Sequence, residues 1–177
     1  MPTRIAVLYV DDEPMLLELG KTFLEDMGEF SVSTAESVAE ASDKLSSKPY
    51  DIIVSDYQMP GTNGIEFLKY TRQRCAHIPF ILFTGRGLEE VVIEALNNGA
   101  EFYLKKGGNP VPQFAELAQK IRVAVHKYRA IRSLEKQTLV LKERIKELAC
   151  LYNLAEIING PGTSLDEMLQ QSADLIP

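Results

Sequence analysis

The first 125 residues alternate between short apolar runs and segments with helical spacing, and this alternation is the strongest constraint on the fold. The apolar runs are Ile5–Val10 and residues 30–34, 52–54, 80–83 and 102–104; helical patterns occupy residues 14–27, 37–45, 63–74 and 88–98, and begin again near residue 112. Strands that alternate with helices pair in parallel, with helices covering both faces. Runs one, three and four are continuously apolar, as expected for strands buried on both faces. The sequence therefore predicts an α/β domain with a doubly wound, five-stranded parallel sheet.

Capping residues mark where several of the predicted helices begin and end. Ser37 stands three residues before Glu40, which is the spacing of a capping box. Asn63 stands three residues before Glu66 and is also a good N-cap. Gly28 and Gly99 follow two of the helical segments, where glycine ends helices readily.

Charge divides the chain into three regions. Residues 1–127 hold 13 basic and 18 acidic residues, residues 128–148 hold 6 and 3, and residues 149–177 hold none and 4. With the helical patterns, this predicts a first domain over 1–127, a helical segment over 128–159 and a short helical tail over 160–177. The net charge of −6 and the interleaved acids in the basic region argue against nucleic-acid binding.

A heptad pattern begins at Ile131. Apolar or small residues recur every seven positions in two series, Ile131, Thr138, Ile145 and Tyr152 at a, and Leu134, Leu141, Leu148 and Ala155 at d. No proline or glycine interrupts the chain between Gln113 and Asn159. We therefore expect one long helix whose seam forms a coiled coil, as a parallel homodimer through residues 128–159. The alternative is a helix that folds back on the first domain.

Polar side chains follow the predicted strands at the edge where parallel strands bind ligands. Asp11 and Asp12 follow the first strand, Asp56 the third, Thr84 the fourth, and Lys105 and Lys106 the fifth. Clustered carboxylates favour a hard divalent cation between them, and Mg²⁺ is the expected ion. A carboxylate beside that ion can act as a nucleophile towards a phosphoryl group.

These motifs together resemble the receiver domain of two-component response regulators, which has a flavodoxin-like fold. The resemblance rests on Asp11-Asp12, on Asp56-Tyr57-Gln58-Met59-Pro60-Gly61 with Gly64, on Thr84, and on the segment from Gly99 to Lys106. It implies that Asp56 accepts a phosphoryl group from a histidine kinase, with Thr84 and Lys106 contacting the phosphoryl oxygens. It also implies Mg²⁺ ligation by Asp12 and Asp56, by the Gln58 backbone carbonyl, and by Asp11 mainly through water.

Two further positions are interpreted through the same resemblance. Tyr103, three residues before the lysine, matches the rotating aromatic of the receiver switch. Counting from Gly99 matches Lys106 to the receiver lysine that contacts the phosphoryl group, and Lys105 to a variable position of the motif. Receivers usually have a proline in a cis peptide bond after this lysine, whereas this chain continues Gly107-Gly108-Asn109-Pro110.

The tail from Leu148 to Pro177 resembles the opening of a GAF domain, because Leu-Tyr-Asn-Leu-Ala-Glu-Ile-Ile is followed by a break and by Ser-Leu-Asp-Glu-Met-Leu. A short capping helix is the alternative interpretation. The apolar runs are too short to span a membrane, and the two distant cysteines fit a reduced, cytoplasmic setting.

Two other functions remain open at this point. A Mg²⁺-dependent phosphohydrolase with an aspartyl nucleophile would carry an acid two residues after Asp56, where this chain has Gln58. A receiver-like scaffold that is not phosphorylated would not need the complete set of acids, hydroxyl and lysine. We therefore expect a signal-transfer module rather than an enzyme, catalysing only its own phosphorylation and dephosphorylation.

Overall fold

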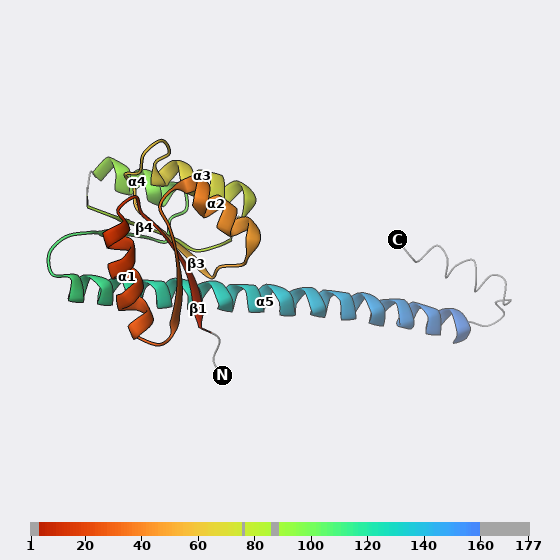
Figure 1. Ribbon diagram of the computed structural model, residues 1–177. Coiled ribbons are helices and arrows are strands. Elements are labelled where there is room, and N and C mark those ends of the chain that lie inside the picture. The colour runs from red at the N-terminus through yellow and green to blue at the C-terminus, as the bar shows by residue number, and fades with distance from the viewer. Residues whose placement is uncertain (1–3, 76, 86–88, 160–177) are drawn as a thin grey trace. The chain divides into compact units, whose positions relative to one another are not determined.

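The computed structural model describes residues 4–75, 77–85 and 89–159, and its first unit is built on a five-stranded parallel sheet (Figure 1). The strand order is β2-β1-β3-β4-β5, and every neighbouring pair runs parallel. The strands and helices alternate as β1 Ile5–Val10, α1 Pro14–Asp26, β2 Phe30–Ala35, α2 Val38–Ser47, β3 Ile52–Ser55, α3 Gly64–Arg74, β4 Phe80–Thr84, α4 Glu89–Asn97, β5 Phe102–Lys105 and α5 Pro110–Asn159. The predicted fold class is confirmed, with small shifts at element ends.

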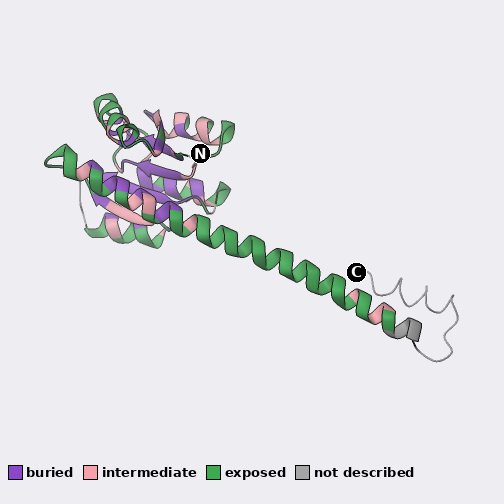
Figure 2. Cartoon of the chain, turned by 90° about the horizontal axis from the view of Figure 1, so that it is seen from below, coloured by how far each residue is buried: buried purple, intermediate pink, exposed green. Residues whose placement is uncertain are grey.

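Helices cover both faces of the sheet. Successive residues of a strand point to opposite faces, so each inner strand contributes side chains to two cores. Val7 and Tyr9 lie in a core with Leu17 of α1 and with the first part of α5. Leu8 and Val10 lie in a second core with residues of α2, α3 and α4. Figure 2 shows the buried strands between these helical layers. Because all five strands run parallel, their carboxyl ends lie at one edge of the sheet.

The predicted capping residues act at the starts of two helices. The Asn63 side chain accepts hydrogen bonds from the N–H groups of Ile65 and Glu66, and the Glu66 carboxylate accepts one from the Asn63 N–H. The capping box at α3 is therefore complete. At α2, Ser37 accepts from the Glu40 N–H, but the Glu40 carboxylate binds the N–H of Glu36 rather than that of Ser37. The second arm of that predicted box thus reaches one residue further back.

Helix α5 is 50 residues long and contributes residues to two compact units. The boundary between these units lies between Arg129 and Ala130. Phe114, Leu117 and Ile121 of its first part are buried in the core of the first unit. Residues 130–149 are exposed in the single chain, as the green part of the helix in Figure 2 shows. The long C-terminal helix is confirmed, whereas the predicted tail at 160–177 lies outside the described residues.

The length of α5 raises the question of a membrane span. None of the helices within the described ranges combines the length with the apolar composition that crossing a bilayer requires.

Candidate functional site

Three aspartates meet where β1 and β3 end. These neighbouring strands pair with Val10 opposite Ser55, so the residues that follow them, Asp11 and Asp56, lie next to each other. Asp11, Asp12 and Asp56 each offer a carboxylate oxygen, and these oxygens lie within 4.8 Å of one another. Asp11 and Asp56 are buried, and Asp12 is partly exposed. The structure therefore brings together the three carboxylates that the sequence placed at this edge.

The Asp56 backbone and side chain are held by their neighbours. The Asp56 N–H donates to the Val10 carbonyl at 2.8 Å, and the Tyr57 N–H donates to Asp56 Oδ1 at 2.7 Å. Gly64, the first residue of α3, packs so closely that a β-carbon there would lie 2.1 Å from the Asp56 carbonyl oxygen. Only glycine fits at this position, and α3 can therefore begin directly against the Asp56 backbone.

Lys106 enters the same site from the end of β5. Its ammonium nitrogen lies 2.5 Å from Asp11 Oδ2 and 3.5 Å from Asp56 Oδ2. The backbone N–H of Lys106 donates to the Thr84 carbonyl at 2.7 Å, and this bond fixes the lysine backbone to the end of β4. Lys105, one residue earlier, is exposed. The lysine that faces the aspartates is thus the one expected from the sequence register.

Burial and charge oppose each other at Asp11. Burial raises the pKa of the Asp11 carboxyl group, and the hydrogen bond and positive charge of Lys106 lower it again without cancelling the rise. Tyr9, which is buried beneath the site, donates its hydroxyl to Asp11 Oδ2 at 3.4 Å. Burial, and then the charge of Asp11, raises the pKa of Tyr9, so this hydroxyl stays protonated and remains a donor.

The other predicted residues lie around this cluster. Thr84 is buried at the end of β4, and Gln58 is exposed in the loop after β3. Both line the same cavity as Asp56 and Lys106. Tyr103 is partly buried in β5, and burial, followed by the charge of Asp56, raises its pKa. The electrostatic influence of Asp56 therefore extends to the predicted switch residue.

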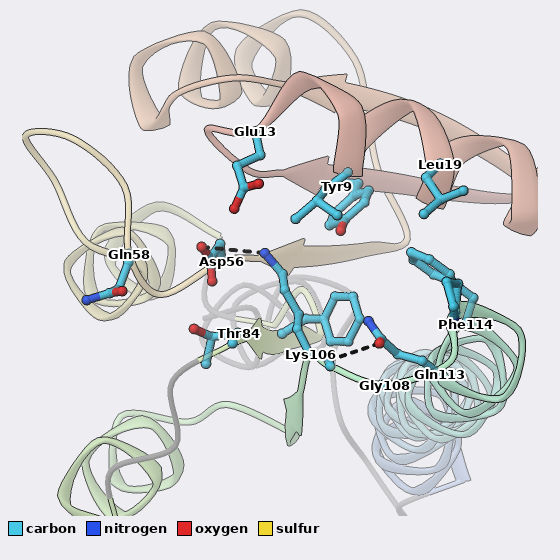
Figure 3. A pocket seen from close by; sticks show the side chains of 15 residues that line it. Tyr9, Glu13, Leu19, Asp56, Gln58, Thr84, Lys106, Gly108, Gln113 and Phe114 are labelled. Atoms are coloured by element: carbon cyan, nitrogen blue, oxygen red, sulfur yellow. Dashed lines mark hydrogen bonds and ion pairs between the residues drawn. The ribbon is translucent and has the colours of Figure 1, made fainter.

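A cavity of about 390 Å³ opens beside Asp56 (Figure 3). Glu13 and Leu19 of the α1 side and Phe114 of α5 line it together with Asp56 and Lys106. Tyr9 and Phe114 were not predicted as parts of the site. The signal for Tyr9 is a single phenol within an otherwise aliphatic strand, while Phe114 is indistinguishable in sequence from any core residue of a helix.

The loop after Lys106 turns through two glycines. Gly107 and Gly108 have φ values of 135° and 88°, where residues with a side chain are strained. The Gly107 N–H donates to Gln113 Oε1 at 3.0 Å, which fixes the loop to the first turns of α5. No peptide bond is cis in the described part of the chain. This loop therefore turns through two glycines with positive φ, where receivers usually have a cis proline.

Comparison with known proteins identifies the family of this fold and site. The model of the response regulator receiver domain matches residues 7–122. This chain belongs to that receiver domain family. As a receiver, it has a phosphoacceptor role in two-component signalling, and the hydrolase and scaffold alternatives are not favoured.

Individual relatives agree with this assignment. The response regulator Rre1 of Synechocystis is 31% identical over 85% of this chain. The Mg²⁺–BeF complex of TrrA from Thermotoga maritima is 32% identical, with a TM-score of 0.60 over 68% of this chain and 98% of that one. The beryllofluoride-activated NtrC4 receiver domain dimer is 28% identical, with a TM-score of 0.63 over 70% and 98%.

The similarity to longer regulators is partial. This chain covers 64% of the length of Rre1, and 36% and 28% of two transcriptional regulators, HoxA of Cupriavidus necator and DctD of Pseudomonas aeruginosa.

Proposed function

We propose that Asp56 accepts a phosphoryl group from the phosphohistidine of a histidine kinase, in a reaction that depends on Mg²⁺. The observation that carries this proposal is the convergence of three carboxylates and the Lys106 ammonium at one sheet edge. The chain would catalyse only its own phosphorylation and slow dephosphorylation. A cytoplasmic setting, where the kinase output would lie, is part of the same proposal.

The acidic cluster fits a magnesium ion by the chemistry of its donors. Asp12 and Asp56 would bind the ion through carboxylate oxygens, Gln58 through its backbone carbonyl, and Asp11 mainly through water. When bound, Mg²⁺ supplies positive charge that offsets the carboxylates and the incoming phosphoryl oxygens. Asp11 would be less costly to keep ionised with that charge nearby, because burial alone favours its neutral form.

The side chains of the site suit each part of phosphoryl transfer. A carboxylate oxygen of Asp56 would form a bond to phosphorus as the phosphorus–nitrogen bond of the phosphohistidine breaks, and the electron pair of that bond stays on the imidazole nitrogen. Lys106 already lies 3.5 Å from Asp56 and would contact a phosphoryl oxygen by a small movement of its ammonium group. The Thr84 hydroxyl would contact another, and exposed Gly85 leaves that approach open.

The same transfer would bias a switch. Thr84 would be drawn towards the phosphoryl oxygens, and Tyr103 would move into the space that Thr84 leaves. The support for this step is the burial of Thr84 together with the electrostatic coupling of Tyr103 to Asp56. A phosphoryl group adds negative charge at the carboxylate to which Tyr103 is already sensitive.

We also propose that the signal passes to a dimeric coiled coil formed by residues 128–159, next to a receiver over 1–127 and a tail over 160–177 that resembles a GAF start. Leu134, Leu141 and Leu148 of the heptad seam are exposed in the single chain, and a partner helix would bury them. A receiver relative solved as a dimer supports self-association of this kind of domain. The kinase and the dimer partner are protein partners; no nucleic acid is included in the proposal.

Labelling with a small acyl phosphate and Mg²⁺ tests the central step. The wild type should become labelled, Asp56→Asn should not, and chelation of Mg²⁺ should abolish labelling. Asp43→Asn, a change of the same chemistry at an exposed position of α2, is the matched control and should label normally. Equal labelling of Asp56→Asn and wild type would refute the proposal, and rapid turnover of a phosphate ester would favour the hydrolase alternative.

A further inference from the structure

A second cavity, of about 440 Å³, lies at the opposite edge of the sheet from the aspartates. Its lining includes Tyr50, which comes before β3, and Ile78, which comes before β4, so it faces the amino ends of these strands. Leu45 near the end of α2 and Tyr128 of α5 complete its apolar lining. None of its lining residues lines the cavity beside Asp56. Its volume falls in the range of small-molecule sites.

The charge of this cavity is opposite to that of the chain. Its lining contains Lys48, Arg74 and His77 and no acidic residue, although the chain has a net charge of −6. The Lys48 ammonium group donates a hydrogen bond to the Ser33 hydroxyl and lies over the Tyr50 ring. The Arg74 guanidinium lies over the Tyr70 ring. Within the described ranges, neither cation forms an ion pair with a carboxylate. Both cations are thus available to an anion.

A buried hydroxyl points to the same conclusion. Among the described residues, the Tyr50 hydroxyl oxygen is the buried side-chain polar atom that lacks a hydrogen-bond partner. Leaving such a donor unsatisfied costs about 1–3 kcal/mol. An acceptor atom on a ligand would remove this cost. Tyr50, which carries this buried hydroxyl, lines the same cavity as the two cations and the apolar residues.

We propose that this cavity binds a small aromatic phosphate of mononucleotide size. Lys48 and Arg74 would hold the phosphate, whose two charges suit two permanent cations better than a single carboxylate does. The Tyr50 hydroxyl would donate to an oxygen of the ligand. Leu45, Ile78 and the ring of Tyr128 provide apolar contact for an aromatic body of the ligand.

Tyr128 would bring such a ligand into contact with the long helix α5. Tyr128 lies in α5 one residue before Arg129, the last residue of the first unit. Arg129 in turn forms an ion pair with Asp51 at 3.0 Å, beside Tyr50 in the sequence. A bound ligand would therefore contact α5 at the end of the receiver unit, as an input separate from phosphorylation of Asp56.

Titration calorimetry of the full chain tests the proposal with adenosine monophosphate as the probe, in the absence of Mg²⁺. Adenosine and inorganic phosphate are the partial probes, and each should bind more weakly than the monophosphate. Lys48→Gln and Arg74→Gln should each weaken binding about tenfold, since each loses a charge-assisted contact. Tyr50→Phe, which removes only the hydroxyl, should weaken it less.

Lys127→Gln is the matched control, because Lys127 is exposed, adjoins Tyr128 and does not line the cavity. It should bind adenosine monophosphate like the wild type. Amide chemical shifts should change near Tyr50, Ile78 and Tyr128 rather than near Lys106. No binding at millimolar probe, equal loss in Lys127→Gln, or shifts confined to the Lys106 edge would overturn the proposal. These outcomes leave the role of Asp56 untouched, because the two sites lie at opposite sheet edges.

Discussion

At Asp11 the cost of burying a carboxylate is opposed by a specific partner, Lys106. Lys106 lies 2.5 Å away, yet the pKa of Asp11 is still raised, so desolvation outweighs the lysine. A carboxyl group with a raised pKa in the folded state binds its proton more tightly there than in the unfolded chain. The folded protein therefore loses stability as the pH rises from the ordinary value of 3.8 through the raised one.

We predict that Asp11→Asn raises the stability of the metal-free protein at neutral pH, because it removes a buried charge. Urea unfolding followed by circular dichroism should show this gain, and the gain should disappear at a pH below the ordinary value of the carboxyl group. Mg²⁺ should stabilise the variant less than the wild type. A loss of stability at neutral pH without Mg²⁺ would mean that the lysine contact outweighs burial.

At the scale of elements, the fold was predictable because apolar runs and caps are local signals. The strand runs and the cap at Asn63 can be read directly from the sequence, and strand order then brings Asp11 and Asp56 together. The partners of these residues could not be predicted in the same way. The hydrogen bond from Tyr9 and the packing of Phe114 depend on how α1 and α5 lie on the sheet, which no short motif encodes.

The start of α3 gives a prediction at this scale. Asn63→Ala should cost about 1 kcal/mol of folding free energy, because both side-chain acceptor bonds of the cap are lost. Chemical denaturation measures the change. Gln73→Ala, at an exposed position of the same helix, is the control and should stay within about 0.5 kcal/mol of wild type. Similar stability of the two variants would contradict an energetic role for the cap.

The glycine turn after Lys106 gives another. Gly107→Pro should destabilise the domain by about 1 kcal/mol or more, because proline requires φ near −65° and this residue has φ 135°. Proline also removes the N–H that Gln113 accepts. Gly107→Ala keeps that N–H and should be less damaging. Thermal unfolding distinguishes them, and a proline variant as stable as wild type would show that the loop accepts the more usual receiver turn.

For the whole molecule, self-association depends on which exposed residues of α5 face a partner. Leu139 and Leu141 are 61% and 59% exposed, but only Leu141 lies on the heptad seam. We predict that Leu141→Glu shifts the protein towards monomer in sedimentation velocity, whereas Leu139→Glu does not. Because both positions are exposed in the single chain, neither change should unfold the receiver. Equal effects of the two changes would argue against the seam.

The contact between Gly64 and the Asp56 carbonyl has a consequence for genetics. Every single-base change of a glycine codon that gives another amino acid introduces a β-carbon, and the structure leaves no room for one at this position. In a library of random variants selected for signalling, position 64 should therefore remain glycine. Gly28, by contrast, has open space around it and only its positive φ to disfavour a side chain. The pattern of tolerated codons would then separate glycines retained for space from glycines retained for conformation.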